Sequence, residues 1–441
     1  MKLSWFTERV LIPGVLSALL LSGCGGGSGG GAGGVTGGGT STPESSSMSR
    51  NLAPVVVQST EVAVVNGINT LGLDLLGTTS GNVVVAPFSA SLSLARLRDG
   101  AMGDTLTAIS GIMHVNGLGD GVDSAFNDLD LGVNGRINAC LLGAQTSQAT
   151  AGAWAQAHYG YRLTYLDALA ENFGLKPSRV DFALDQSDAA QKLSDWSLQA
   201  VGLAPLVTTT QDTRLVLGDA VQLNAAWADP FDPALTETNI FKLLDSSTVN
   251  VPFMLKTATL PQTSGNGYMA LALPLSGGQQ LLVVLPDEGR YTEIQTALTA
   301  EMLKQIAAAL VPAQVNLSFP KFSIKGNITL DLGVAATKGV ADFSGMDGTR
   351  NFYVASTVHG SRLSVAEAGL QAGSVTQIAL EDLNPGTLGS SSSGLIDSDI
   401  TITIGPLPTI TVLIARPFIF AVRDSVTGAI IFMGRVMDPS L

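Results

Sequence analysis

Chemically reactive side chains are scarce in this sequence, which has two cysteines and three histidines among 441 residues. Two cysteines cannot supply the disulfide framework that holds small secreted domains together, so packing must stabilise the fold. The histidines (His114, His158 and His359) do not have the spacing of a metal-ligand pair, and the glycine runs precede no strand-to-helix turn that would cradle a phosphate. The sequence therefore predicts neither a metal site nor a cofactor.

Basic residues are also in the minority, with 23 Lys and Arg against 36 Asp and Glu and a formal net charge of -13. Sequence-independent binding to nucleic acid depends on Lys and Arg that neutralise phosphates, so this charge excludes such a partner. Charged residues make up only 13% of the chain and hydrophobic residues 45%. These proportions are typical of a globular chain with a large core.

The N-terminal apolar run, from Val10 to Leu21, is too short to span a bilayer comfortably. Together with Lys2 and Arg9 before it, the run predicts an export signal over residues 1–23 that is removed. The signal ends in Leu21-Ser22-Gly23-Cys24, which resembles the lipobox of bacterial lipoproteins. That resemblance implies that Cys24 becomes the lipidated first residue of the mature chain. The alternative is an ordinary secretory signal with an incidental cysteine.

A tether follows the signal, because residues 24–52 are mostly Gly, Ser and Thr and cannot bury enough apolar surface to fold. A Gly-rich coil of this length has a root-mean-square reach of roughly 30 Å. We expect an exported protein, lipid-anchored to a bacterial membrane, with its folded domain (residues 53–441) in the periplasm or on the cell surface. Cys140 is then a lone thiol, and the sequence assigns it no role.

Helices early in the domain and strands late in it predict an α+β fold with large antiparallel sheets. Helical spacing covers 68–76, the segment after Pro87 and 191–200, and 149–170 is expected to be a strand that runs into a helix. Strand patterns cover 83–85, 215–223, 268–273, 280–285, 315–324, 362–366, 400–404, 409–414, 418–422 and 430–436. The serine-rich stretch 384–394 predicts an exposed loop.

An ordered series of motifs from about residue 68 to the C-terminus resembles the serpin family. Each motif is weak alone, and the ordered series is specific. The matching segments are 82–89, 100–105, 125–131, 227–233 (with Trp227, Pro230 and Phe231), Phe319-Pro320-Lys321-Phe322, 341–346, 358–359, 367–369, 416–420 (with Arg416, Pro417 and Phe418), 432–436 and 438–439. The resemblance implies the serpin fold, with helices packed on large sheets and an exposed reactive-centre loop at about 367–408.

The family pattern implies mechanical roles for four residues of the main sheet. Ser89, Asp219 and His359 match the shutter, the hydrogen-bonded zone beneath the strands that part, and Trp227 matches the end where the loop enters. We expect Asp219 to contact His359 in the closed sheet and to favour the imidazolium. A catalytic pair is the alternative, but no Gly-x-Ser-x-Gly elbow accompanies it, and we interpret the Ser318-x-x-Lys321 pattern as coincidence.

The hinge of the loop follows Glu367 in this resemblance and contains Gly369, Leu370, Gln371, Ala372, Gly373, Ser374 and Val375. A segment that inserts as a strand must turn alternate side chains toward the core. From Leu370 to Leu380, the inward row contains no charge, and the outward row, which we expect to face solvent, is mostly small or polar. Leu370 stands where the family prefers a small residue, and a bulky hinge that enters slowly favours hydrolysis over trapping.

Two counts place the bond that a protease would cut. The family's spacing from Glu367 gives Leu383-Asn384, and counting back from Pro417 gives Pro406-Leu407. The difference of about 23 residues between Leu383 and Pro406 indicates an insertion. We place the insertion after the cut, because the hinge spacing is normal and extra residues there leave a captured protease tightly held.

The resemblance implies an inhibitor rather than an enzyme: a monomeric suicide substrate for a serine or cysteine protease, chymotrypsin-like or elastase-like. A non-inhibitory serpin-fold surface protein that uses the long loop for recognition is the alternative. A hydrolase that uses His359 is a third and less favoured hypothesis.

Overall fold

A six-stranded sheet, called here the main sheet, positions the candidate site. The computed structural model describes residues 45–119, 121–204, 206–383 and 409–440, which lie in one compact unit. Only β4 and β5 are parallel neighbours in this sheet. Its strands lie in the order β12 (Phe322–Thr329), β13 (Phe352–Ala366), β14 (Gly369–Asp382), β6 (Thr213–Ala226), β4 (Gln148–Gln156) and β5 (Ser178–Val180).

A second sheet packs beside the first and carries the C-terminal strands. Along its path lie β1 (Val83–Val85), β17 (Ile430–Val436), β16 (Phe418–Asp424), β10 (Gln279–Pro286), β9 (Tyr268–Pro274), β8 (Thr248–Gly265), β11 (Val311–Pro320) and β15 (Thr409–Leu413), and β7 (Glu237–Lys242) pairs with β8. β15 is parallel to β11. A small hairpin joins β2 (Leu141–Leu142) and β3 (Gln145–Thr146).

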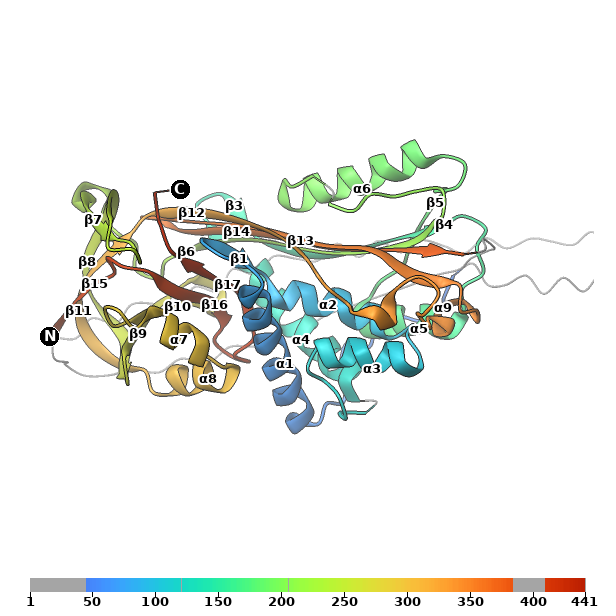
Figure 1. Cartoon of the computed structure of the whole chain (residues 1–441), viewed down its shortest axis with the longest axis horizontal. Coiled ribbons are helices and arrows are strands. Elements are labelled where there is room, and N and C mark those ends of the chain that lie inside the picture. Colours follow the sequence, from blue (N-terminus) through green and yellow to red (C-terminus); the bar gives the residue numbers. More distant parts are fainter. Residues whose placement is uncertain (1–44, 120, 205, 384–408, 441) are drawn as a thin grey trace, which may run out of the picture. The chain divides into compact units, whose positions relative to one another are not determined.

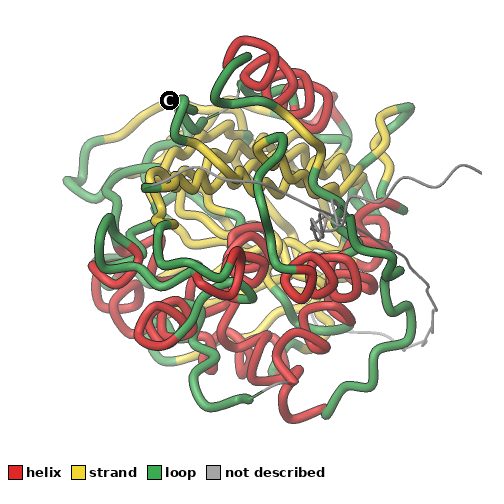
Figure 2. Tube along the Cα trace, turned by 90° about the vertical axis from the view of Figure 1, so that its right-hand side faces the viewer, coloured by secondary structure: helices red, strands yellow, loops and turns green. Residues whose placement is uncertain are grey.

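The helices cover both faces of the main sheet (Figure 1). They are α1 (Gln58–Gly77), α2 (Pro87–Arg98), α3 (Gly103–Ile112), α4 (Gly121–Asn138), α5 (Leu163–Phe173), α6 (Gln186–Val201), α7 (Tyr291–Ala297), α8 (Ala300–Ala308) and α9 (Ser344–Asp347), with single 3₁₀ turns at η1 (Pro233–Leu235), η2 (Ser276–Gly278) and η3 (Val334–Ala336). Figure 1 shows α6 on one side of the main sheet and α2 to α5 on the other, and Figure 2 shows these layers end-on.

Local sequence explains the two helices that flank the site. α2 begins at Pro87, whose missing N–H suits the first turn, and it is buried on every side as far as Leu97. Asp185 is the N-cap of α6, and its side chain accepts from the Asp188 N–H. Gly218 of β6 lets α6 approach, because a Cβ there would lie 3.0 Å from the Trp196 ring. Within the described part of the chain, no helix combines the length and apolar character that crossing a membrane requires.

The predicted α+β class is confirmed, with two differences in its elements. The strand expected over 315–324 is two strands, β11 and β12, that separate at Lys321. The loop expected to be exposed from 367 contains a strand, β14, in the middle of the main sheet. The strand expected over 400–404 and the loop over 384–394 lie outside the described residues.

Contacts of the folded domain begin before residue 53, where the sequence placed its start. The Arg50 guanidinium pairs with the Asp130 carboxylate at 2.6 Å, and its Nε donates to Asn127 Oδ1 at 2.7 Å. The Asn51 N–H donates to Glu171 O. A buried ion pair at Arg50 fixes the chain there, so the structured part includes the end of the expected tether.

Candidate reactive loop and shutter

Trp227 holds the turn that joins β13 to β14. Glu367 and Ala368 form this two-residue turn, and the Trp227 backbone N–H donates to Ala368 O at 3.1 Å. The indole Nε1 donates to Ala366 O at 2.8 Å. Trp227 therefore lies at the end of the main sheet where the predicted hinge begins, and it is buried.

Glu367 is fixed at this turn by two side chains. Lys321 Nζ donates to Glu367 Oε1 at 2.9 Å, and Thr236 Oγ1 donates to the same oxygen at 2.8 Å. Burial alone would raise the pKa of Glu367, but these hydrogen bonds hold it below its ordinary value. Because the Lys321 ammonium binds Glu367, the Ser318-x-x-Lys321 pattern does not form a catalytic pair here.

The inward row of β14 is a continuous buried ridge. Its members Leu370, Ala372, Ser374, Thr376, Ile378 and Leu380 are each at most 1% exposed. The four apolar members belong to the main hydrophobic core. The uncharged row that the sequence showed thus fits the sheet interior, where an unpaired charge would be costly.

The outward row faces α6 rather than solvent, so the expectation of a solvated face is wrong over most of its length. Val375 packs with Ala200 and Val201 of α6. Gln377 Oε1 accepts from the Leu206 N–H at 2.7 Å, in the segment that follows the helix. Gln371, near the hinge, is exposed. The small and polar residues of this row serve a close fit beneath α6.

A chain of hydrogen bonds crosses the shutter through Thr376 of β14. The Ala86 N–H donates to His359 Nε2 at 2.9 Å, so Nδ1 carries the proton and donates to Thr376 Oγ1 at 2.8 Å. Thr376 Oγ1 lies 3.2 Å from Ser89 Oγ, which donates to Asp219 O at 3.5 Å. Complete burial lowers the pKa of His359 to about 4, which keeps the imidazole neutral.

The expected contact between Asp219 and His359 is absent in this conformation, because Thr376 pairs with both residues and lies between them. Asp219 Oδ2 instead binds Arg96 Nη1 of α2 at 2.8 Å. Burial raises the pKa of Asp219 to about 6, against the opposing effect of Arg96. With β14 in the sheet, Asp219 therefore does not favour the imidazolium, and the contact expected for the closed sheet stays a prediction.

The far end of β14 is anchored by two phenols. Tyr159 Oη donates to Asp382 Oδ2 at 2.6 Å, and Tyr353 Oη donates to Glu381 Oε2 at 2.5 Å. The Asp382 N–H also donates to the backbone of Asp212 at 3.0 Å. The two acidic residues at the end of β14, Glu381 and Asp382, therefore have hydrogen-bond donors just beyond the uncharged row.

The predicted cut sites lie at or beyond this anchored end. The Leu383 N–H donates to Asn351 O at 3.1 Å, and the Leu383 side chain is exposed. Asn384, the other half of the first predicted bond, lies outside the described residues, as do Pro406 and Leu407. The structure therefore places Leu383 beyond Asp382, at the end of β14 opposite the turn that Trp227 holds.

Arg96, Lys321 and Tyr159 contribute to the site but were not predicted from the sequence. The sequence around Arg96 could have indicated a buried ion pair, because the residues before it in the α2 sequence are apolar or small. Lys321 and Tyr159 offered none, since their partners are 46 and 223 residues away in the chain.

The remaining reactive groups do not extend the site. Cys140 is fully buried and its Sγ lies 3.1 Å from Ser276 O, and burial raises the pKa of the thiol to about 11. Cys24 lies outside the described residues. Among the described residues, His, Cys, Asp and Glu form no cluster suited to a metal ion.

This arrangement of sheet, hinge and shutter is that of a serpin, and the comparisons agree. The family model "Serpin (serine protease inhibitor)" matches residues 69–439. The chain therefore belongs to the serpin family, whose members are typically protease inhibitors, although some are non-inhibitory.

Relatives and solved structures match over most of their lengths. An uncharacterized serpin-like protein of Thermococcus kodakarensis is 28% identical over 403 residues, which cover 87% of this chain and 88% of the relative. The structure "Cleaved Serpin 42Da" has a TM-score of 0.72 at 21% identity, covering 86% of this chain and 99% of the other. Human thyroxine-binding globulin, solved as a complex, has a TM-score of 0.66 at 22% identity, with coverage of 86% and 99%.

Proposed function

We propose that this serpin inhibits a serine or cysteine endopeptidase as a suicide substrate. The observation that supports the proposal is β14, a segment with the composition of a reactive loop that occupies the middle of the main sheet. A cut near Leu383 would free the C-terminal end of this segment, and the acyl-linked protease would travel with it to the Tyr159 end of the sheet. Chymotrypsin-like and elastase-like proteases are the proposed targets, because Leu383 is the residue before the first predicted bond.

The buried inward row explains why entry of this segment would be favourable. Leu370, Ile378 and Leu380 are each fully buried. Complete burial of one such side chain contributes roughly 1.5–3 kcal/mol relative to exposure. Three of them supply several kcal/mol in the direction of entry, before the backbone bonds to β6 and β13 are counted.

Covalent complex formation tests the proposal. The chain is refolded from denaturant, mixed at once with chymotrypsin or pancreatic elastase, and resolved by SDS gel electrophoresis and intact mass spectrometry. We expect a band at the summed mass that survives SDS. A Ser374→Arg variant places a charge in the buried row and should be cleaved without forming that band, whereas Gln305→Arg, at an exposed position of α8 outside the loop and the main sheet, should behave as the parent. Clean cleavage of the parent chain with no complex would contradict the proposal.

We further propose that Cys24 carries a lipid that holds the domain at a bacterial cell envelope, in the periplasm or on the surface. The support is the sequence Leu21-Ser22-Gly23-Cys24 followed by a Gly-rich stretch. Expression in a bacterium supplied with labelled palmitate should label the parent chain and leave a Cys24→Ser variant unlabelled. An unlabelled, freely released parent chain would overturn this anchor.

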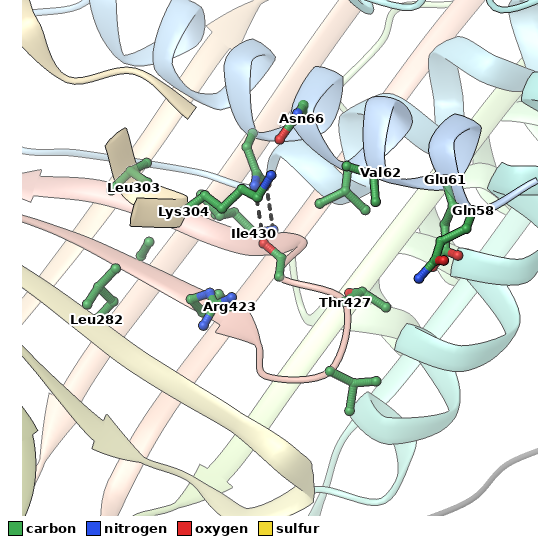
Figure 3. Close-up of a pocket in the computed structure, with 15 residues that line it drawn as sticks. Gln58, Glu61, Val62, Asn66, Leu282, Leu303, Lys304, Arg423, Thr427 and Ile430 are labelled. Atoms are coloured by element: carbon green, nitrogen blue, oxygen red, sulfur yellow. Dashed lines mark hydrogen bonds between the residues drawn. The ribbon is translucent and has the colours of Figure 1, made fainter. Parts of the chain in front are cut away.

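A second candidate function, a non-inhibitory binding protein, is favoured by a cavity of about 220 Å³ between α1, α8 and the second sheet (Figure 3). Apolar side chains from all three elements line it, including Val62, Leu303 and Ile430. Arg423 lies in its wall, and burial lowers the pKa of this guanidinium, which indicates incomplete solvation. Lys304 is a second cation at the cavity, and Glu61 of α1 is an anion in the same lining, so the two cations outnumber it.

An apolar molecule that carries a carboxylate fits this combination of walls and cations. Thyroxine-binding globulin, named above for its ligand, shares the fold, and the same kind of role is what we propose as the alternative here. Titration of dansyl-undecanoate should show saturable fluorescence enhancement that an Arg423→Met variant weakens at least about tenfold, while Arg290→Met, remote from the cavity, leaves it unchanged. Equal binding by both variants would exclude Arg423 from recognition. The extended loop, which the sequence offered as a recognition element, lies outside the described residues.

A further inference from the structure

β14 and β15 occupy their sheets at the same time in one uncut chain. β14 is paired on both edges, with β13 from Ala366↔Gly369 to Phe352↔Asp382 and with β6 over nearly the same length. β15 remains paired with β11 from Thr409 to Leu413, and its Val412 is 2% exposed. Entry of the loop segment and retention of β15 are therefore compatible in this chain.

The two points that the chain must connect lie at opposite ends of the main sheet (Figure 1). β14 ends at Asp382, beside Tyr159 and close to α9. β15 lies on the hinge side of β14, about one β7 length away (six residues, about 20 Å), as contacts at the two ends of β7 show. Thr236, just before β7, bonds Glu367, and Lys242, its last residue, donates to Ala415 just after β15. A chain that leaves β14 must therefore return along the sheet to reach β15.

Chain length decides whether this return is possible. β14 has 14 residues and is about 46 Å long at 3.3 Å per residue. Residues 383–408 provide 26 residues between the strands, which when extended reach at most about 90 Å. Without the insertion of about 23 residues, the three left would reach only about 13 Å. A serpin with that short connection would have to be cut, or would have to release β15, before β14 could enter fully.

We propose that the extended connection lets this serpin insert its reactive loop without proteolysis and without releasing β15. The uncut chain could then adopt the conformation with β14 inserted in the main sheet, in the absence of any protease. Insertion withdraws the loop segment from attack by a protease. Because the long segment 383–408 permits insertion, its length would limit the time for which an inhibitory form persists. The inference goes beyond the proposed function, because it concerns the chain before it meets a target.

Hydrogen exchange on protease-free, mass-verified chain tests the proposal. Peptides that cover 370–380 and 409–413 should both exchange at least about 100-fold more slowly than an unstructured reference. Cleavage within 384–408 should then raise the thermal midpoint by no more than about 3 °C, because the segment is already inserted. Rapid exchange over 370–380, or a gain above about 10 °C on cleavage, would overturn the proposal.

Two variants separate connection length from other causes. A chain that lacks residues 385–407 should either leave 370–380 unprotected or protect it only with loss of protection at 409–413. A chain in which the same residues are replaced by an equally long Gly-Ser repeat should behave as the parent. Protection of both segments in the shortened, uncut chain would contradict the length argument.

A full-length Thr376→Arg variant keeps the test decisive if the shortened chain does not fold. Its buried charge should prevent entry and expose 370–380 to exchange, while 409–413 stays protected. Failure of the protease complex assay would leave these exchange results unchanged, so the two proposals can fail separately.

Discussion

The free energy of unfolding should depend on pH through His359 and Asp219 in opposite directions. Burial lowers the pKa of His359 to about 4 and raises that of Asp219 to about 6. A lowered histidine pKa means that the unfolded chain binds the proton more readily. Its stabilising contribution is therefore complete above pH 6.5 and is lost as pH falls toward 4. For Asp219, the folded chain binds the proton more readily, so its contribution is complete below pH 3.8 and is lost as pH rises through 6.

The two contributions are of similar size. The shift of His359 corresponds to about 3 kcal/mol between pH 7 and pH 4, at 1.36 kcal/mol per pKa unit. The shift of Asp219 corresponds to about 2–3 kcal/mol over the same interval, with the opposite sign. The parent chain should therefore show a weak net dependence from this pair, which single substitutions would reveal.

Urea unfolding at pH 4, 5, 6 and 7 of the parent, His359→Gln and Asp219→Asn chains provides the assay. The free energy of unfolding of the parent, relative to that of His359→Gln, should fall by about 3 kcal/mol from pH 7 to pH 4. The difference between parent and Asp219→Asn should change in the opposite sense. The ion pair with Arg96 is lost as Asp219 is protonated, and this change is already contained in the pKa of Asp219, so it adds no separate dependence on pH. Differences that are constant with pH, or that change in the same direction, would refute the assignment of a neutral imidazole and a buried carboxylate.

Three further predictions follow from contacts around the main sheet. Arg96→Met should lower the free energy of unfolding, measured in urea, by about 3–5 kcal/mol, because it leaves the Asp219 carboxylate buried without its partner. The double variant Arg96→Met with Asp219→Asn should recover much of that loss. An unchanged free energy in Arg96→Met would contradict the ion pair. Trp227→Phe removes the indole donor to the last carbonyl of β13 and should cost about 1 kcal/mol, seen as a small drop in the calorimetric midpoint, and no drop would exclude that hydrogen bond as a stabilising contact. In a Cys24→Ser chain, Cys140 should react with Ellman's reagent only after denaturation, because its burial raises the thiol pKa; rapid reaction of the folded chain would argue against the buried position.

Strand alternation made much of the fold predictable from the sequence. The uncharged row from Leu370 to Leu380 follows the period of two that a strand imposes, and the structure buries each of its members. The late strands at 268–273, 280–285 and 430–436 were predicted because short β-branched and apolar runs alternate there with turn residues.

Contacts that depend on which strands are neighbours were not predictable in this way. The Asp219–His359 contact was expected for a sheet in which β6 and β13 are adjacent, and in the sheet described here Thr376 of β14 lies between them. The expected solvent-facing row ignored α6, because nothing in the pattern of Val375 or Gln377 shows that a helix will cover them. In each case the missing information is the arrangement of elements distant in the chain.

The position of α6 over β14 has a consequence for the order of events during entry. Val375 packs beneath Ala200 and Val201, so a strand cannot slide into place while the helix is seated above it. The helix must lift and settle again, and the edge-to-face pair of Trp154 and Trp196, with ring centroids 5.0 Å apart, would be disturbed each time. In a Trp227→Phe chain, the emission of Trp154 and Trp196 should therefore follow the helix rather than the strand, and a transient change in emission would time the opening of this cover.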